Sequence, residues 1–249
     1  MNLPAIDAHA HIATSVTARQ LGQLGSAIIF AMTREPAEAG EALTRSDRNI
    51  IWACGAHPAF VAGGADIDLG QFARRVKRFA VVGEIGLDRR AGNLERQTDV
   101  FTSILDTIRD EQVLVSIHSA GCTAEVTAVL TRYRLPGTIV HWFNGTSSQV
   151  DDLLAAGCYF SVNTAMRREV LDLLPIDRIL TETDFPTARK RTGVRPGDVS
   201  TIEELLAEKH ALAPEALRRR MLVNLRRIAV TSGAIDRLPM HVADTLLMA

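Results

Sequence analysis

The stretch from Leu3 to His11 reads LPAIDAHAH and places two histidines at the end of a short apolar run. Residues two apart in a strand point to the same face, so His9 and His11 would project together from one strand end. Taken singly, a histidine in this position is more often a hydrogen-bonded, partly buried side chain than a metal ligand. The meaning of the pair therefore depends on what the rest of the chain places beside it.

Short apolar runs recur along the whole chain and alternate with longer stretches of helical spacing. This alternation is typical of strand–helix units around a parallel sheet, and eight units close a barrel. We therefore predict an α/β fold, a single TIM-like (β/α)8 barrel over residues 1–232, followed by a loose C-terminal extension over 233–249. The tail from Thr201 to Val230 is predicted to be helical, with Pro214 at a helix start. The eight predicted strands are Leu3–Ala8, Ala27–Met32, Ile50–Cys54, Ala80–Ile85, Val113–Ile117, Thr138–His141, Cys158–Val162 and Arg178–Thr183.

The composition limits the class of protein. A chain of 249 residues, 47% of them hydrophobic, can bury one large core. Its formal net charge of -1 excludes a global basic field, so any contact with nucleic acid must come from a local patch. No apolar run is long enough to span a membrane and the first residues do not resemble a signal peptide, so we expect a cytoplasmic protein without membrane contact. Cys54, Cys122 and Cys158 are expected to be buried free thiols.

Histidines and acidic residues gather at the predicted strand ends, where barrels of this kind carry their reactive groups. Five of the seven histidines lie there. Imidazoles and carboxylates that converge on one rim are suitable ligands for a divalent transition metal, and random placement seldom produces such a set. The sequence therefore predicts a metal site. The residues at the strand ends are His9, His11, His57, Glu84, His118, His141, Glu182 and Asp184.

Two ions are predicted rather than one, because six good ligands exceed the four that a single structural ion needs. Glu84 is the natural bridge between two ions, which would share a hydroxide that attacks phosphorus. Asp184 could bind metal and also orient or deprotonate that water, and its alternative role is a helix N-cap. With His141 or His57 assisting the transition-state charge, the predicted catalytic residues are Asp184, Glu84, His141 and His57.

Six motifs lie at the strand ends: Asp7-Ala-His-Ala-His11, Gly55-Ala-His-Pro58, Gly83-Glu-Ile-Gly-Leu-Asp88, Ser116-Ile-His118, His141-Trp-Phe-Asn-Gly145 and Thr181-Glu-Thr-Asp184. They resemble the motifs of the TatD family of metal-dependent hydrolases, in family order and across nearly the whole barrel. The resemblance implies hydrolysis of DNA, often from the 3′ end, with Mg²⁺ or Mn²⁺ in use and Zn²⁺ often found bound. It also implies the metal ligands His9, His11, Glu84, His118, His141 and Asp184, with His57 nearby as a catalytic or phosphate-facing residue.

Two positions depart from the family pattern. Ala59 follows Pro58 where many relatives have a second histidine, and Ala120 and Gly121 follow Ser119 where many have an arginine. We therefore expect the phosphate contacts of this protein to differ from those of its relatives, and its substrate need not be a free DNA end.

A narrower resemblance concerns three segments in the second half of the chain. His141-Trp-Phe-Asn-Gly145, Gly157-Cys-Tyr-Phe-Ser161 and Ala165-Met166 are similar to QatD, the TatD-like component of a bacterial anti-phage system. This resemblance implies partners from the same operon, including an ATPase and a QueC-like protein.

Basic residues gather in the loops of the predicted rim. They could follow a sugar-phosphate backbone, with an aromatic side chain from Trp142, Phe143, Tyr159 or Phe185 stacked on a base. The favoured substrate contacts are Arg89, Arg189, Arg191 and Trp142, and the alternative is an ordinary solvated loop. The basic rim residues are Arg89, Arg90, Arg167, Arg168, Arg189, Lys190, Arg191 and Arg195.

Two other functions stay open. A small-molecule hydrolase of the wider amidohydrolase type shares the His-x-His start, but many binuclear members of that type bridge with a carboxylated lysine where Glu84 stands here. The second is a non-catalytic, metal-binding subunit of a defence complex. The intact ligand set weighs against it, and the missing phosphate contacts weigh slightly for it. The sequence favours a metal-dependent phosphodiesterase, a deoxyribonuclease, in bacterial anti-phage defence.

Overall fold

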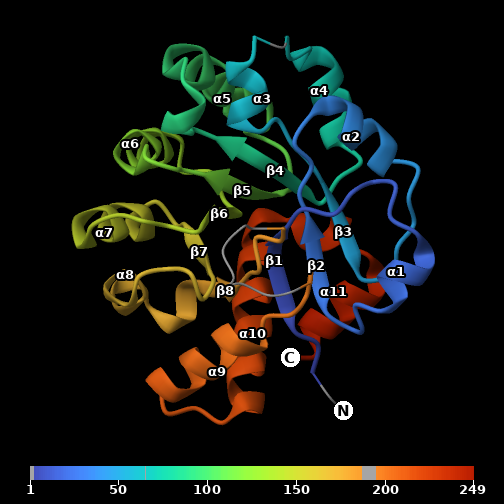
Figure 1. Ribbon diagram of the computed structural model, residues 1–249, viewed down its shortest axis with the longest axis vertical. Coiled ribbons are helices and arrows are strands. Elements are labelled where there is room, and N and C mark those ends of the chain that lie inside the picture. The colour runs from blue at the N-terminus through green and yellow to red at the C-terminus, as the bar shows by residue number, and fades with distance from the viewer. Residues whose placement is uncertain (1–2, 65, 187–194) are drawn as a thin grey trace.

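The computed structural model of the protein describes residues 3–64, 66–186 and 195–249. In this part of the chain, eight strands pair in chain order and every neighbouring pair is parallel. Figure 1 shows the sheet curled into a nearly closed barrel with helices around it. The predicted TIM-like (β/α)8 barrel is therefore confirmed. The strands are β1 (Ile6–Ala10), β2 (Ile28–Ala31), β3 (Ile50–Cys54), β4 (Val81–Gly86), β5 (Leu114–His118), β6 (Thr138–His141), β7 (Tyr159–Val162) and β8 (Ile179–Thr181).

Helices follow the strands and cover the outside of the barrel (Figure 1). In α5, the Asn93 side chain caps the N-terminus, and Phe101, Ile104 and Leu105 on one face are buried. The outer helices are α1 (Ala18–Gly22), α2 (Pro36–Ala42), α3 (Pro58–Ala62), α4 (Leu69–Val76), α5 (Leu94–Thr107), α6 (Thr123–Tyr133), α7 (Ser147–Ala155), α8 (Arg168–Leu173) and α9 (Ser200–Lys209), with the 3-10 turns η1 (Arg89–Ala91) and η2 (Ile176–Arg178).

The first strand is displaced along the chain relative to the predicted run. It begins at Ile6 and ends at Ala10, so His9 lies inside the strand rather than beyond it. All five residues are buried, Asp7 and His9 included. The predicted strand ended at Ala8 because the apolar run stops where the polar residues of the site begin. The observed strand continues to Ala10 because its bounds depend on backbone pairing with β2, whatever the side chains are.

The barrel closes between its first and last strands through individual hydrogen bonds. The backbone N–H of Asp184 donates to His9 O at 2.8 Å, and the Thr181 hydroxyl donates to Ile6 O. The Asp7 carboxylate accepts from Thr183 N at 2.9 Å, from the Thr183 hydroxyl at 2.7 Å and from Gly197 N at 2.7 Å. A buried carboxylate from β1 therefore ties down the chain that follows β8, at the same level as the ends of both strands.

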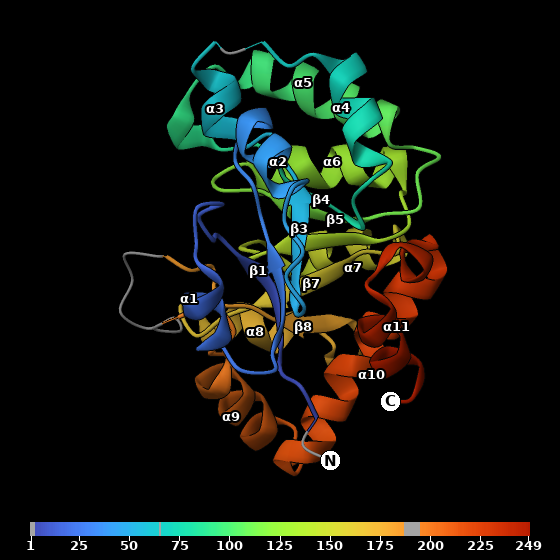
Figure 2. The same ribbon diagram turned by 90° about the vertical axis from the view of Figure 1, so that its right-hand side faces the viewer.

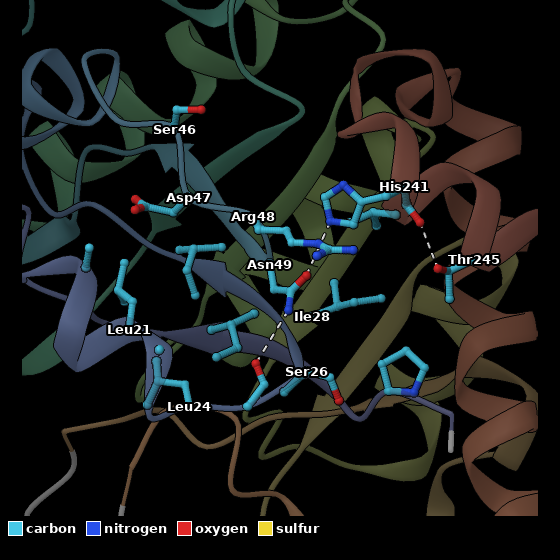
Figure 3. Close-up of a pocket in the computed structure, with 18 residues that line it drawn as sticks. Leu21, Leu24, Ser26, Ile28, Ser46, Asp47, Arg48, Asn49, His241 and Thr245 are labelled. Atoms are coloured by element: carbon cyan, nitrogen blue, oxygen red, sulfur yellow. Dashed lines mark hydrogen bonds between the residues drawn. The ribbon is translucent and has the colours of Figure 1, made fainter. Parts of the chain in front are cut away.

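The C-terminal residues are ordered against the barrel. Two helices at Ser200–Lys209 and Pro214–Ser232 (α10) confirm the predicted helical tail and its start at Pro214. The extension was expected to be loose, and this is wrong: it forms the turn η3 (Ala234–Arg237) and the helix α11 (Met240–Leu247). Val242 and Leu246, one turn apart in α11, are buried, and Figure 2 shows α11 lying beside α10. His241 in α11 has its Nε2 3.3 Å from Asn49 Oδ1 (Figure 3). No helix in the described residues is both long and apolar enough to cross a membrane.

The three cysteines are buried and free, as predicted. Burial raises the pKa of Cys54 and of Cys158 to about 12, so both thiols stay protonated at neutral pH. They are packing groups of the core rather than nucleophiles.

Candidate metal centre

Seven side chains meet at the mouth of the barrel, which is the end where the strands finish. They come from six strands, so no single element could have assembled them. The structure brings together every residue that was predicted to bind metal or to act in catalysis. They are His9 in β1, His11 just after it, His57 after β3, Glu84 in β4, His118 and His141 at the ends of β5 and β6, and Asp184 after β8.

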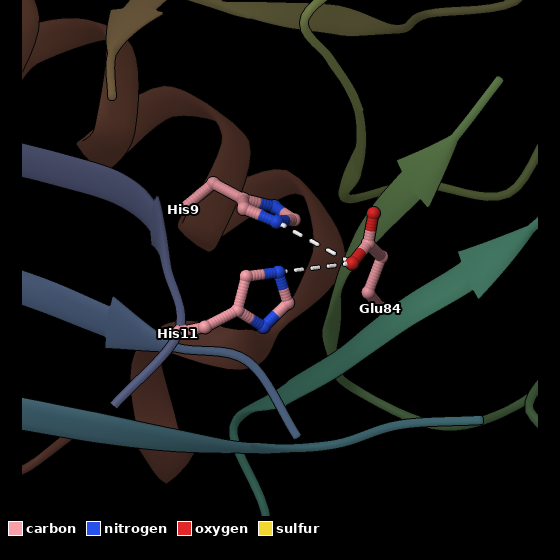
Figure 4. A group of neighbouring side chains, drawn as sticks. All are labelled: His9, His11 and Glu84. Atoms are coloured by element: carbon pink, nitrogen blue, oxygen red, sulfur yellow. Dashed lines mark ion pairs between the residues drawn. The ribbon is translucent and has the colours of Figure 1, made fainter. Parts of the chain in front are cut away.

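Glu84 lies at the centre of this cluster and faces imidazoles with both carboxylate oxygens. Oε2 lies 3.2 Å from His11 Nε2, 3.5 Å from His57 Nε2 and 3.7 Å from His9 Nε2. Figure 4 shows His9 and His11 directed at this oxygen. Oε1 lies 2.9 Å from His141 Nε2 and contacts His118 Nδ1. One buried carboxylate therefore separates two sets of nitrogen donors.

Asp184 reaches the Oε2 side of the cluster. Its Oδ1 lies 3.8 Å from His9 Nε2 and 3.9 Å from His11 Nε2. The residue has a φ of 48°, in the left-handed region that aspartate tolerates better than most residues. The alternative role as a helix N-cap finds no support in the described residues, because α9 begins at Ser200 with Val199 as its N-cap.

The buried donors fit a divalent metal ion. His9 Nε2 and Glu84 Oε2 are buried, and neither has a hydrogen-bond partner in the described part of the chain. Two ligands that each lie about 2.1 Å from one ion are roughly 3–3.5 Å apart, so the spacings around Glu84 Oε2 suit ligation better than hydrogen bonding. Among the described residues, three donor groups could hold an ion: His9, His11 and Glu84; His57, Glu84 and His118; and His9, His141 and Glu182.

Burial and mutual repulsion keep part of this cluster neutral. Burial, followed by the charge of His141, lowers the pKa of His9 to about 3. Burial also lowers the pKa of His57 to about 4, although Glu84 opposes the shift. A neutral imidazole has one free lone pair, so His9 is ready to bind a metal through Nε2 without losing a proton. In His57 the Nδ1 lone pair accepts from Ala59 N, so the ring proton lies on Nε2, which faces the cluster as a donor.

The carboxylate at the centre stays ionised. Burial raises the pKa of Glu84, but the surrounding imidazoles, above all His118, hold it well below its ordinary value. Burial likewise acts to lower the pKa of His118, and the Glu84 and Asp88 carboxylates outweigh it and raise that pKa to about 9. Without an ion, protons on His118 and His141 balance the buried charge, and a metal would replace them.

Asp184 differs from Glu84 in its protonation. Burial raises the pKa of Asp184 to about 6, while the charge of His141 opposes that change. A carboxyl group with a pKa near 6 can accept and release a proton close to neutral pH. In the cluster without an ion, Asp184 is therefore protonated more readily than Glu84.

The sequence did not identify the groups that support the imidazoles. Ser116 Oγ lies 2.9 Å from His9 Nδ1, and Asp88 Oδ2 lies 3.4 Å from His118 Nε2. Glu182, which was seen only as part of a strand end, lies 3.7 Å from His141 Nδ1. A signal exists for Ser116, because it precedes His118 by two residues and so shares a strand face with it.

The structure describes two of the four predicted substrate contacts, Arg89 and Trp142. Arg89 is tethered, since its Nη2 pairs with Glu125 and its Nε donates to Gly121 O at 2.7 Å. Arg189, Lys190 and Arg191 lie outside the described residues. Trp142 follows β6 directly and is half-buried beside the site.

Two of the aromatic candidates for base stacking are wrong. Phe143 is fully buried, with its ring centroid 5.2 Å from that of Phe160. Tyr159 is buried at the start of β7, away from the mouth, with the Arg178 guanidinium 5.1 Å from its ring centroid. Their order in the sequence could not show this, because the direction of a side chain depends on the strand register.

Arg34 is a rim cation that the sequence analysis missed. It follows β2, its side chain is exposed, and its carbonyl oxygen accepts from His57 N at 2.8 Å. Its charge is close enough to help burial lower the pKa of His57. The only signal was its position two residues after the end of a predicted strand.

Comparisons with known proteins agree with this geometry. Residues 6–229 match the model of the family described as TatD related DNase. A protein named 3'-5' ssDNA/RNA exonuclease TatD, from Erwinia billingiae, is 29% identical over 238 residues, which cover 85% of this chain and 89% of that protein.

Solved structures of the same family share the fold. A TatD homolog from Escherichia coli, YJJV, has a TM-score of 0.77 at 23% identity and covers 90% of this chain and 97% of its own. A TatD family hydrolase from Entamoeba histolytica has a TM-score of 0.74 at 15% identity, over 92% of this chain and 98% of its own. With the fold, the cluster at the barrel mouth and the family match in agreement, the chain belongs to the TatD-related DNase family of metal-dependent hydrolases.

Proposed function

We propose that the protein is a metal-dependent phosphodiesterase that hydrolyses DNA. The observation that carries the proposal is the position of Glu84 between two sets of imidazoles, with buried donor atoms that have no hydrogen-bond partner. This donor set suits two divalent ions, with Mg²⁺ or Mn²⁺ supporting activity and Zn²⁺ retained in the purified protein. When bound, such ions polarise a phosphate group and lower the pKa of a water molecule.

The ligands fall on the two sides of Glu84. On the Oε2 side, His9, His11 and Asp184 would complete one position. On the Oε1 side, His118 Nδ1 and His141 Nε2 are 3.1 Å apart and would complete the other. The proposed metal ligands are therefore His9, His11, Glu84, His118, His141 and Asp184.

The proton of the attacking water goes to Asp184 in this proposal. Its position beside the Oε2 ligands places a carboxylate oxygen where it can take up that proton. His57 has its Nε2 directed into the cluster, while its Nδ1 accepts from Ala59 N at 3.0 Å. That backbone bond fixes the ring, so His57 would position the phosphate and assist the developing charge, while both ring nitrogens of His141 face other groups of the centre.

The substrate we propose is single-stranded DNA. The name of the Erwinia relative supports a single-stranded substrate and includes RNA. At the rim, Trp142 can stack on a base, and the exposed Arg34 can contact a phosphate. Arg89 would act through its charge, because Glu125 and Gly121 O already engage its guanidinium. Arg189 and Arg191 complete the proposed substrate contacts.

In the cell, we place the protein in the cytoplasm as part of an anti-phage defence system, with an ATPase and a QueC-like protein as partners. The similarity of segments 141–145, 157–161 and 165–166 to QatD supports this assignment. The free, buried cysteines are in keeping with a reducing compartment.

The test is hydrolysis of end-labelled single- and double-stranded DNA and of RNA by the purified chain. The protein is first treated with a chelator, and Mg²⁺, Mn²⁺ or Zn²⁺ is then added back. Cutting that a metal restores and that Asp184→Ala abolishes is the expected result. No cutting by protein that holds its metal would contradict the proposal.

Two further assays separate the alternatives. A panel of lactones and cyclic amides distinguishes an amidohydrolase, which would hydrolyse a carbonyl substrate and leave DNA intact. For the scaffold reading, phage protection is compared between wild type and Glu84→Ala. Full protection by a folded Glu84→Ala variant would mean that the role in defence does not depend on metal chemistry.

A further inference from the structure

The two sides of Glu84 differ in what lies behind their imidazoles. On the Oε1 side, each ring has a carboxylate at its outer nitrogen: Glu182 Oε1 lies 3.7 Å from His141 Nδ1, and Asp88 Oδ2 lies 3.4 Å from His118 Nε2. On the Oε2 side, the support is neutral. His9 Nδ1 meets the Ser116 hydroxyl, His57 Nδ1 accepts a backbone N–H, and His11 Nδ1 is buried without a partner among the described residues.

The Glu182 carboxylate is fixed by residues of the neighbouring strand. It is fully buried, and it accepts hydrogen bonds from the Ser161 hydroxyl and, at 2.8 Å, from Asn163 Nδ2. Ser161 lies in β7 and Asn163 directly follows that strand, two residues later, so both side chains point to the same face. Asn163 is held in turn, because its Oδ1 accepts from Ala165 N at 2.9 Å. The carboxylate therefore has little freedom to turn away from His141.

Glu182 offers an acceptor for the outer nitrogen of His141. When Nε2 binds a metal, the ring proton must lie on Nδ1 and needs an acceptor in this buried place. In the described structure, Nδ1 has no hydrogen-bond partner, and the nearby acceptor is Glu182 Oε1. A small rotation of the ring would shorten 3.7 Å to hydrogen-bond length.

The two sides of Glu84 also differ in the number of carboxylates that could contact an ion. An ion on the Oε2 side would meet Asp184 as well as its share of Glu84, whereas an ion on the Oε1 side would meet only its share of Glu84. A carboxylate behind an imidazole increases the donor strength of that ring and so returns negative charge to the ion indirectly. The Oε1 side is the side that lacks a second carboxylate ligand, and it is the side where the rings are backed by carboxylates.

We propose that Glu182, held by Ser161 and Asn163, is a positioning residue that fixes His141 with its proton on Nδ1 and gives the metal position at His118 and His141 its affinity. The proposal rests on the metal-dependent function stated above. Glu182 itself contacts neither metal nor substrate in this role.

The test compares Glu182→Gln with Glu203→Gln. Both replace a buried carboxylate by its amide, but Glu203 lies on α9 and pairs with Arg218, with Oε1 at 3.0 Å from Nε. Mn²⁺ and Zn²⁺ are titrated into the metal-free proteins by calorimetry. In Glu182→Gln, one of two binding events is expected to weaken by roughly 10- to 100-fold, with the other within about threefold of wild type. Both events are expected to be unchanged in Glu203→Gln.

Histidine-ring nitrogen-15 NMR of the Zn²⁺-loaded proteins gives a second readout. The His141 Nδ1 proton is expected far downfield in wild type and upfield of that position in Glu182→Gln, because the charged acceptor is gone. Equal affinities together with an unchanged Nδ1 proton would overturn the proposal. Equal weakening of both binding events would also overturn it, since that points to a general structural role.

A variant that keeps the carboxylate guards against misfolding. If Glu182→Gln does not fold, Asn163→Ala decides, and it is expected to weaken the same single event by a smaller factor. An unaffected event in Asn163→Ala would count against the proposal. DNA cleavage by the wild type is measured in parallel. If the wild type does not cleave DNA but Glu182→Gln weakens one metal-binding event, only the proposed function is contradicted. If the wild type cleaves DNA but metal binding in Glu182→Gln is unchanged, only this inference is contradicted.

Discussion

Replacing Glu84 by glutamine tests whether one carboxylate serves both metal positions. The two oxygens face different imidazoles, with His11 Nε2 3.2 Å from Oε2 and His141 Nε2 2.9 Å from Oε1. An amide offers one neutral oxygen and one NH2 group that cannot bind a cation. In Glu84→Gln, one position would therefore lose its anionic ligand outright, and the other would keep only a neutral one.

The size of the effect follows from the linkage between binding and folding. At a free ion concentration of about 100 times Kd, one occupied position stabilises the folded protein by about 2.7 kcal/mol, and two by about 5 kcal/mol. For a chain of this length, about 1 kcal/mol changes Tm by roughly 2–4 °C, so Mn²⁺ should raise the wild-type Tm by roughly 10–20 °C. In Glu84→Gln, the rise should fall to about 3 °C or less.

Scanning calorimetry of each protein, without metal and with Mn²⁺, measures this difference. Asp184→Asn is the matched control, because it removes a carboxylate from the Oε2 side only and should keep about half of the wild-type rise in Tm. Two ions bound to Glu84→Gln with the full wild-type rise in Tm would refute the assignment of Glu84 as the shared ligand.

Three further predictions concern turnover, pH and the C-terminal helix. At saturating metal, Asp184→Asn should lower kcat for DNA by about 10²- to 10⁴-fold with little change in KM, which steady-state assays would show. Burial raises the pKa of Asp7 from 3.8 to about 7. The folded protein therefore holds the extra proton between these values, so the stability of the metal-free protein should fall as pH rises through that range. In urea titrations, the free energy of unfolding should fall by at most about 4 kcal/mol over this range. The same pH dependence in Asp7→Asn as in wild type would contradict the reasoning. Leu246→Ala should cost about 2–5 kcal/mol of unfolding free energy, whereas Leu247→Ala, at a position 57% exposed, should change it by less than about 0.5 kcal/mol.

The strands and the cluster at the mouth could be predicted because both leave a local mark on the sequence. Each strand is an apolar run of a few residues, and a parallel barrel brings all the strand ends to one side, whatever the details of packing. His118 and His141, at strand ends predicted from such runs, therefore came together without knowledge of any contact.

The groups that hold the site depend on contacts between distant segments. Ser161 and Asn163 donate to Glu182, which lies about 20 residues further along the chain. The sequence of β7 alone does not show that its hydroxyl and amide groups will face this carboxylate. The order of α11 depends in the same way on distant contacts, such as that of His241 Nε2 with Asn49 Oδ1 at 3.3 Å. Phe143 was misjudged for a related reason, since an aromatic residue next to a site residue can point into the core.

The closure of β1 on β8 has a consequence for the order in which the enzyme is built. The bond from Thr181 to Ile6 spans 175 residues of the 249, so it forms only after the chain has left the ribosome as far as Thr181. Contacts of such long range are costly in loop entropy and form late in folding. His118 and His141 sit on adjacent strands and can meet much earlier. A nascent or truncated chain could therefore assemble the Oε1 half of the centre, while the half that needs Asp184 exists only in a finished barrel.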